Sequence, residues 1–301
     1  MIGRSLVLVF MVLVATVGSA TAAMADELTD RMGDGAGIVY SGEQSVVCNQ
    51  PDGRHSELFD VGQNDLGITV TVDPAGTTRA ARAGTLSTGL GSQYEIKLSA
   101  QGEVLGRPVE VIDVLDGDAL RVRLSFDVAS SVLLMSEIFN GDGSMYCTTR
   151  FIEFNLGSPG PARGVTTVDS PEPAGVVQAD NVDRTLPPQL AGFSRLQVGV
   201  GSESDVSLAF YGDGLFTFQL TNSNRPISIP ELEGQPRATI EGHEYQRIFE
   251  LGRVVYAWNS ELGGYVLVGE LPVDVQARVL SALPDPRSRG FFERLWDGLF
   301  G

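Results

Sequence analysis

Alternating apolar and polar residues predict β-strands along most of the chain. In the first half, the alternating segments are rich in β-branched and aromatic residues, and turn signals such as Asp116-Gly117 and residues 140–143 separate them. The predicted strands cover residues 67–72, 94–98, 108–115, 119–126, 131–139 and 145–156. Their order favours an antiparallel meander, preceded by a short helix over residues 26–32 and a glycine-rich turn from Gly33.

The strand predicted at residues 119–126 shows the clearest division between its two faces. Its even-numbered positions are all apolar, whereas its odd-numbered positions from Arg121 to Ser125 are arginine or serine. We therefore expect this strand to bury one face and to expose the other.

A hairpin is predicted in residues 206–220, where apolar residues alternate on both sides of a Gly-Asp-Gly turn. A two-residue loop would pair these apolar residues with Thr217, Gln219 or Tyr211. A three-residue loop keeps one face apolar, because it pairs Phe210 with Phe216, Leu208 with Phe218 and Val206 with Leu220. We therefore expect a loop of Gly212, Asp213 and Gly214, in which Gly214 takes the left-handed conformation that follows a type I turn.

The rest of the second half predicts two more strands and two helical segments. The strands cover residues 253–258 and 265–269, and a helix over residues 274–283 begins with Asp274 as a candidate cap. After Pro284 and Pro286, one stripe of a further helix is apolar and contains Phe291, Phe292, Leu295, Trp296, Leu299 and Phe300. This stripe either packs on the protein or forms a helix that contacts a partner or a membrane surface.

Proline, glycine and acidic residues without periodicity mark residues 158–188 as a linker. It separates a domain of residues 26–157 from one of residues 189–285, and an amphipathic tail of residues 286–301 follows. Each domain has the size expected for a single core.

The first 25 residues have the layout of a secretory signal peptide. They carry one cation, Arg4, then an apolar run over residues 6–17, and small residues before Asp26. The apolar run is shorter than the roughly 20 residues that a membrane-spanning helix needs. We expect cleavage before Asp26 and a periplasmic or otherwise extracytoplasmic mature protein; the alternative is an uncleaved N-terminal anchor.

The formal net charge of −17 narrows the range of partners. A field of this sign repels phosphates and anionic lipid surfaces, so nucleic acid is a poor candidate. A cationic protein surface, or a neutral apolar ligand held in a cavity, fits the charge better.

The two cysteines, Cys48 and Cys147, are expected to form one disulfide in an oxidising compartment. A bridge that closes a loop of about 100 residues stabilises a domain by about 4–5 kcal/mol on the chain-entropy model. The alternative is a pair of buried thiols. A redox centre is disfavoured, because the sequence has no CxxC motif.

Motifs for catalysis and for cofactor binding are missing. The two histidines, His55 and His243, do not stand in a metal-ligand pattern, and there is no GxSxG elbow, phosphate-binding loop or dinucleotide fingerprint. The turn from Asn140 lacks the terminal glutamate of a calcium loop. We expect a protein without metal or cofactor that is not an enzyme; a hydrolase with an unrecognised carboxylate pair is the alternative.

Two stretches resemble the RseB/MucB family of sigma-E regulatory proteins. In the second half, "YGDGLFTFQL" and the later "YVLVGELPVDVQARVLSAL" are similar to the family's C-terminal domain, at positions Tyr211, Asp213, Gly214, Leu215, Gly269, Glu270 and Pro272. In the first half, residues 104–157 follow the RseB and LolA-like order, with a Gly106-Arg107 step and a strand that starts at Arg121 and ends at Asp127. The opening, residues 35–47, matches the family only loosely, and the cysteine pair is not a general family feature.

The resemblance implies a mainly β (α+β) protein. A LolA-like antiparallel half-barrel precedes a smaller β-rich domain with a C-terminal helix. It also implies a regulator that binds the extracytoplasmic part of an anti-sigma factor, shields it from proteolysis and is released by a lipid-like ligand. The alternative is a LolA-type carrier or sensor of lipids or lipoproteins.

Overall fold

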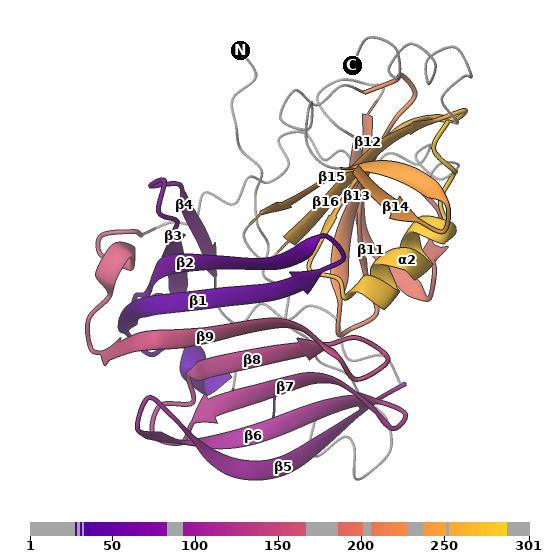
Figure 1. Cartoon of the computed structure of the whole chain (residues 1–301). Coiled ribbons are helices and arrows are strands. Elements are labelled where there is room, and N and C mark those ends of the chain that lie inside the picture. Colours follow the sequence, from indigo (N-terminus) through magenta and orange to yellow (C-terminus); the bar gives the residue numbers. More distant parts are fainter. Residues whose placement is uncertain are drawn as a thin grey trace. The chain divides into compact units, whose positions relative to one another are not determined.

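A computed structural model describes Leu28, Arg31 and residues 33–82, 93–166, 186–200, 206–227, 237–250 and 253–287. The expected signal segment, the linker from residue 167 to 185 and the apolar tail with Phe291, Phe292, Leu295, Trp296 and Leu299 lie outside the described residues. Where it is described, the chain is mainly β, as predicted, with two antiparallel sheets and a helix that follows the last strand (Figure 1).

The first sheet has nine strands in the order β4-β3-β2-β1-β9-β8-β7-β6-β5. These are β1 (Tyr40–Gln50), β2 (Gly53–Gln63), β3 (Ile68–Val72), β4 (Thr78–Arg82), β5 (Tyr94–Val104), β6 (Arg107–Asp116), β7 (Ala119–Asp127), β8 (Leu133–Phe139) and β9 (Met145–Leu156). The strands from β5 to β9 form the predicted meander. The sheet stays open, with β4 and β5 at its two edges.

The second sheet has eight strands in the order β10-β11-β12-β13-β17-β16-β15-β14. These are β10 (Gln189–Leu190), β11 (Phe193–Val200), β12 (Val206–Gly212), β13 (Thr217–Ser223), β14 (Arg237–Ile240), β15 (His243–Glu250), β16 (Arg253–Ser260) and β17 (Gly263–Gly269). Of the proposed linker, the described residues contain one short helix, η1 (Gly160–Ala162).

The chain divides into two compact units. The first holds residues 1–174 with the nine-stranded sheet, and by its contacts it also includes the short segments 212–217 and 272–274. The second unit holds the remaining residues with the eight-stranded sheet.

Strands β1 and β9 form the centre of the first sheet and carry the disulfide. Cys48 and Cys147 are directly opposite each other on these strands and their sulfur atoms are bonded, as predicted. Farther along the same pair, Gly42 leaves room for the backbone carbonyl of Glu153 and for the ring of Phe151. This ring contacts Tyr40 and Phe154, with centroid separations of 5.8 and 5.1 Å. A covalent bond and an aromatic cluster therefore hold the same two strands.

Two expectations for the first unit are wrong. Residues 33–36 are helical and not a turn. Strand β7 buries most of its second face as well, because Arg121, Ser125 and Asp127 are as inaccessible as the apolar residues between them, while the side chain of Arg123 stays 37% exposed. The arginines of this face are paired with carboxylates, Arg121 with Asp274 and Arg123 with Asp113. The polar face can therefore be covered without leaving an unpaired charge.

The predicted register of the β12–β13 hairpin is also wrong. The Asp213 N–H donates to the carbonyl of Phe216, so Gly214 and Leu215 alone form the loop. The buried face before the loop consists of Ala209 and Tyr211 instead of Leu208 and Phe210. The shorter loop is stabilised by the Asp213 carboxylate, whose Oδ1 accepts hydrogen bonds from the N–H groups of Leu215 and Phe216. Gly214 has a positive φ of 91°, as predicted.

Helix α2 (Val273–Ser281) packs on the second sheet, and Val275, Val279 and Leu283 are buried, as the spacing predicts. Tyr256 donates its hydroxyl hydrogen to the side-chain oxygen of Gln276 at 2.7 Å. Asp274 does not cap the helix as expected, since it lies within the first turn. The N–H of Val273 is instead bonded to the side chain of Asn140.

The register of the hairpin can be tested with two neighbouring aromatic residues. Tyr211→Ala should destabilise the second unit by about 3–5 kcal/mol, because the buried ring stacks on Phe218. Phe210→Ala, the matched control, should cost clearly less, because Phe210 is only half-buried. Urea unfolding monitored by tyrosine and tryptophan fluorescence measures both costs; the reverse order would restore the three-residue loop.

Candidate partner-binding surface

Among the described residues, no group of three or more His, Cys, Asp or Glu side chains is arranged to hold a metal ion. The same residues contain no helix that is long and apolar enough to cross a membrane.

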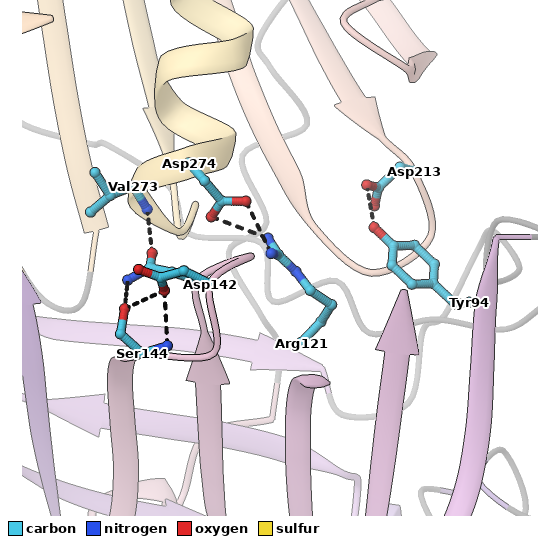
Figure 2. A network of polar contacts seen from close by, with 8 residues as sticks. Tyr94, Arg121, Asp142, Ser144, Asp213, Val273 and Asp274 are labelled. Atoms are coloured by element: carbon cyan, nitrogen blue, oxygen red, sulfur yellow. Dashed lines mark hydrogen bonds and ion pairs between the residues drawn. The ribbon is translucent and has the colours of Figure 1, made fainter. Parts of the chain in front are cut away.

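Arg121 takes part in one of several polar contacts that lie near one another in the first unit (Figure 2). Its side chain leaves the start of β7, is 5% exposed and forms an ion pair with Asp274, with 3.0 Å between Nη1 and Oδ2. The guanidinium group also lies over the ring of Phe216, 5.5 Å from the centroid. Gly141 permits this arrangement, since an added Cβ would lie only 2.9 Å from Nη1 of Arg121.

Two further hydrogen bonds hold the short segments 212–217 and 272–274 to the rest of the first unit (Figure 2). The hydroxyl group of Tyr94 donates to Oδ2 of Asp213 at 2.7 Å. Burial, and then the adjacent Asp213 carboxylate, raise the pKa of Tyr94, so this tyrosine stays neutral and remains a donor. The side-chain oxygen of Asn140 accepts the N–H of Val273 at 3.0 Å. Both contacts join residues that are more than 100 positions apart in the sequence, and both fix a loop.

The Asn140 turn is itself stabilised by a local pair. Asp142 accepts hydrogen bonds from both the hydroxyl and the backbone N–H of Ser144, at 2.6 and 2.9 Å (Figure 2). These bonds lower the pKa of Asp142 and keep it ionised. The turn is therefore held in the shape that presents Asn140.

A row of charges crosses β6, β7 and β8. Asp113, Arg123 and Glu137 are directly opposite one another on these strands, and Arg123 binds Asp113 through two hydrogen bonds of 2.7 and 2.9 Å. Burial raises the pKa of Glu137, Arg123 opposes this rise, and Asp113 adds to it. Arg123 is therefore hydrogen-bonded to Asp113, and it acts on Glu137 only through its charge.

Among the described residues of this unit, Asp127 is the most deeply buried carboxylate, with 0% of its surface exposed. Arg107 donates to both of its oxygens at 2.9 and 2.8 Å, and the hydroxyl of Ser130 donates to Oδ2. Burial alone would raise the pKa of Asp127, but the bonds from Arg107 and Ser130, together with the Arg107 charge, outweigh it and lower the pKa.

One surface depression of about 380 Å³ lies on the first unit. The turn between β5 and β6 forms one side of it, and β8 and β9 form the other. It is lined by Glu103, Val104, Leu105, Met135, Arg150, Phe151 and Ile152. Leu105 and Ile152 are exposed apolar residues, so the depression presents hydrocarbon to solvent.

The residues that the sequence singled out lie at different places. Tyr211 is buried against Phe218 and donates its hydroxyl hydrogen to the carbonyl of Pro187. Asp213, Gly214 and Leu215 form the hairpin turn, and Asp213 alone of these takes part in the polar contacts of Figure 2. Sequence reasoning missed Tyr94 and Asn140. The arginines of β7, embedded in an apolar alternation, were the one visible sign of these contacts.

Comparison with protein families identifies a known domain type in the first half of the chain. Residues 43–183 match the family model of the MucB/RseB N-terminal domain. This part of the chain is therefore similar to the N-terminal domain of the MucB/RseB family. The resemblance predicted from the sequence is thereby confirmed. Among curated protein sequences, no match to the chain is found.

Solved structures extend the likeness of fold beyond that domain. A crystal structure of MucB has a TM-score of 0.52 and 19% identity, and covers 88% of this chain and 99% of MucB. A crystal structure of MucB in complex with MucA(peri) has a TM-score of 0.50, 18% identity and the same coverage. At these identities the likeness concerns the fold, and it includes both sheets of the chain.

Asn140→Ala should loosen the first turn of α2, because the N–H of Val273 loses its side-chain acceptor. The expected cost is about 1 kcal/mol, typical of a lost helix cap. Hydrogen exchange followed by mass spectrometry should show faster exchange of a peptide that spans residues 270–277. Asn155→Ala, which removes an exposed asparagine of β9 that donates to Glu153, is the control and should leave exchange of this peptide unchanged; an equal effect there would remove the specific role of Asn140.

Asp127→Asn should destabilise the protein by about 3 kcal/mol at neutral pH, because Arg107 loses a buried counter-charge. The pKa of Asp127 is lower in the folded than in the unfolded protein, so its stabilisation is complete above the unfolded value of about 3.9 and is lost as the pH falls through the folded value.

The difference in unfolding free energy between wild type and Asp127→Asn should therefore shrink below about pH 4. Urea unfolding at a series of pH values measures this difference, and Asp65→Asn at an exposed turn is the control. A difference that does not change with pH would mean that the ion pair is not the source of the effect.

Proposed function

We propose that this protein is an extracytoplasmic negative regulator of a sigma-E-type envelope stress response. In this role it binds the extracytoplasmic part of an anti-sigma factor and shields that part from proteolysis. The observation that carries the proposal is the family match of residues 43–183, joined to the likeness of fold with MucB, which has been crystallised in complex with MucA(peri).

The charge of the chain supports a protein partner of opposite sign. A net charge of −17 steers cationic surfaces toward the molecule and disfavours anionic ones. Its action outside the cytoplasm follows from the proposed signal peptide of residues 1–25. Both properties suit a regulator that meets the exposed part of a membrane-anchored protein.

Release by a lipid-like ligand is the finer part of the proposal. The nine-stranded sheet is open, and its β5 edge exposes Leu98 on the same face as the apolar residues Ile112 and Leu124. Burial of each methylene of a hydrocarbon ligand on such a face is worth about 0.8 kcal/mol. If the ligand and the partner prefer different states of the protein, binding of the ligand lowers the affinity for the partner.

Affinity capture of the mature chain, residues 26–301, from native envelope extract tests the proposal. The expected partner is a single-pass membrane protein with a cytoplasmic sigma-binding domain. Addition of the regulator should slow cleavage of that partner by its envelope protease, and titration with a single-chain phospholipid should restore cleavage. Capture of lipids or lipoproteins without such a partner would replace this proposal by the LolA-type carrier.

A further inference from the structure

Leu105 stands in a conformation that leucine disfavours. Together with Gly106 it forms the two-residue turn between the paired residues Val104 and Arg107. Both turn residues have positive φ, 53° for Leu105 and 71° for Gly106. Turns of this kind favour asparagine, aspartate or glycine at the first position. Burial does not compensate the strain, because Leu105 is 46% exposed. The identity of this residue is therefore not explained by the stability of the fold.

Ile152 is presented to solvent by a second irregularity. On β1, the neighbours Glu43 and Gln44 pair with Glu153 and Phe151 of β9, so Ile152 is the extra residue of a β-bulge. Its side chain is 38% exposed. Bulges redirect side chains and occur frequently beside functional sites. Two separate departures from regular strand geometry thus expose two aliphatic side chains.

Both side chains line the depression of about 380 Å³ described above. This volume lies at the small end of the range for ligand pockets. Val104 and Met135 add further hydrocarbon to the lining, and Glu103 and Arg150 contribute one negative and one positive charge. The depression therefore combines an apolar surface with two charges of opposite sign.

We propose that this depression docks an apolar side chain of a protein partner, carried on a segment that has a basic and an acidic residue beside it. A peptide segment complements both Glu103 and Arg150 and fills the depression with one side chain. An anionic lipid complements only Arg150 and meets a protein of net charge −17, and a zwitterionic phospholipid carries both charges but also a long acyl chain that an open depression of about 380 Å³ does not enclose. The identification of the partner as an anti-sigma factor rests on the proposed function; the docking surface itself does not.

Leu105→Asn separates docking from stability, because its two expected effects have opposite signs. Asparagine fits the left-handed turn better than leucine, so the melting temperature should rise by about 2–4 °C. Partner capture should become about tenfold weaker, equivalent to 1.4 kcal/mol. Leu66→Asn, which also replaces an exposed leucine of the first unit, is the control and should leave capture unchanged. A more stable Leu105→Asn variant with wild-type capture would overturn the proposal.

Photo-crosslinking in intact cells decides whether the occupant is a protein. The probe p-benzoylphenylalanine is placed at Leu105, at Ile152 and, as a control, at Leu66 of the full chain. Protein adducts at the first two positions, with few at the third, are expected. Adducts with lipid alone, with a second copy of this chain alone, or no adduct, overturn the proposal. A protein adduct that is not an anti-sigma factor keeps the docking site and removes the proposed function.

Discussion

Pairing of arginines with carboxylates across neighbouring strands is the interaction on which the first unit depends. Arg107 with Asp127 and Arg123 with Asp113 join β6 to β7, and Arg121 binds Asp274. Without these pairs, β7 would carry uncompensated charges on a covered face, and one lost partner would cost several kcal/mol. With them, the strand buries its apolar face and most of its polar face, apart from Arg123, and the polar face acquires directional hydrogen bonds that fix loops.

The same feature explains where sequence reasoning succeeded and where it failed. Alternation located the strands from β6 to β9 to within two residues, because each has an apolar face, and it located the start of β5 but not its exposed second half, which runs on from residue 98 to Val104. It missed β1 and β2, in which glycine, serine and glutamine dilute the alternation. It also assigned a solvated face to β7, because an arginine in the sequence does not reveal that a carboxylate far along the chain covers it.

The hairpin at Asp213 shows a different limit. Phe210 and Tyr211 are both large and aromatic, so two registers offered an apolar face and hydrophobicity alone did not decide between them. The observed register is stabilised by the carboxylate of Asp213, which accepts hydrogen bonds from two N–H groups of its own turn and from the hydroxyl of Tyr94. Tyr94 is 119 residues away in the sequence. A contact of that range carries no local signal.

Buried polar residues and exposed aliphatic residues have different roles in the first unit. Buried carboxylates and arginines have their hydrogen bonds directed inward, at Asp127 to Arg107 and Ser130, and they hold the strands and turns in place. The surface at Leu105 and Ile152 has the opposite character, since strain and a bulge bring aliphatic groups outward where the fold gains little from them. The strand that carries Ile152 is held to β1 by the disulfide and by the aromatic cluster around Phe151, and the strand that follows Leu105 is held to β7 by Arg107, so neither strand depends on these two aliphatic side chains.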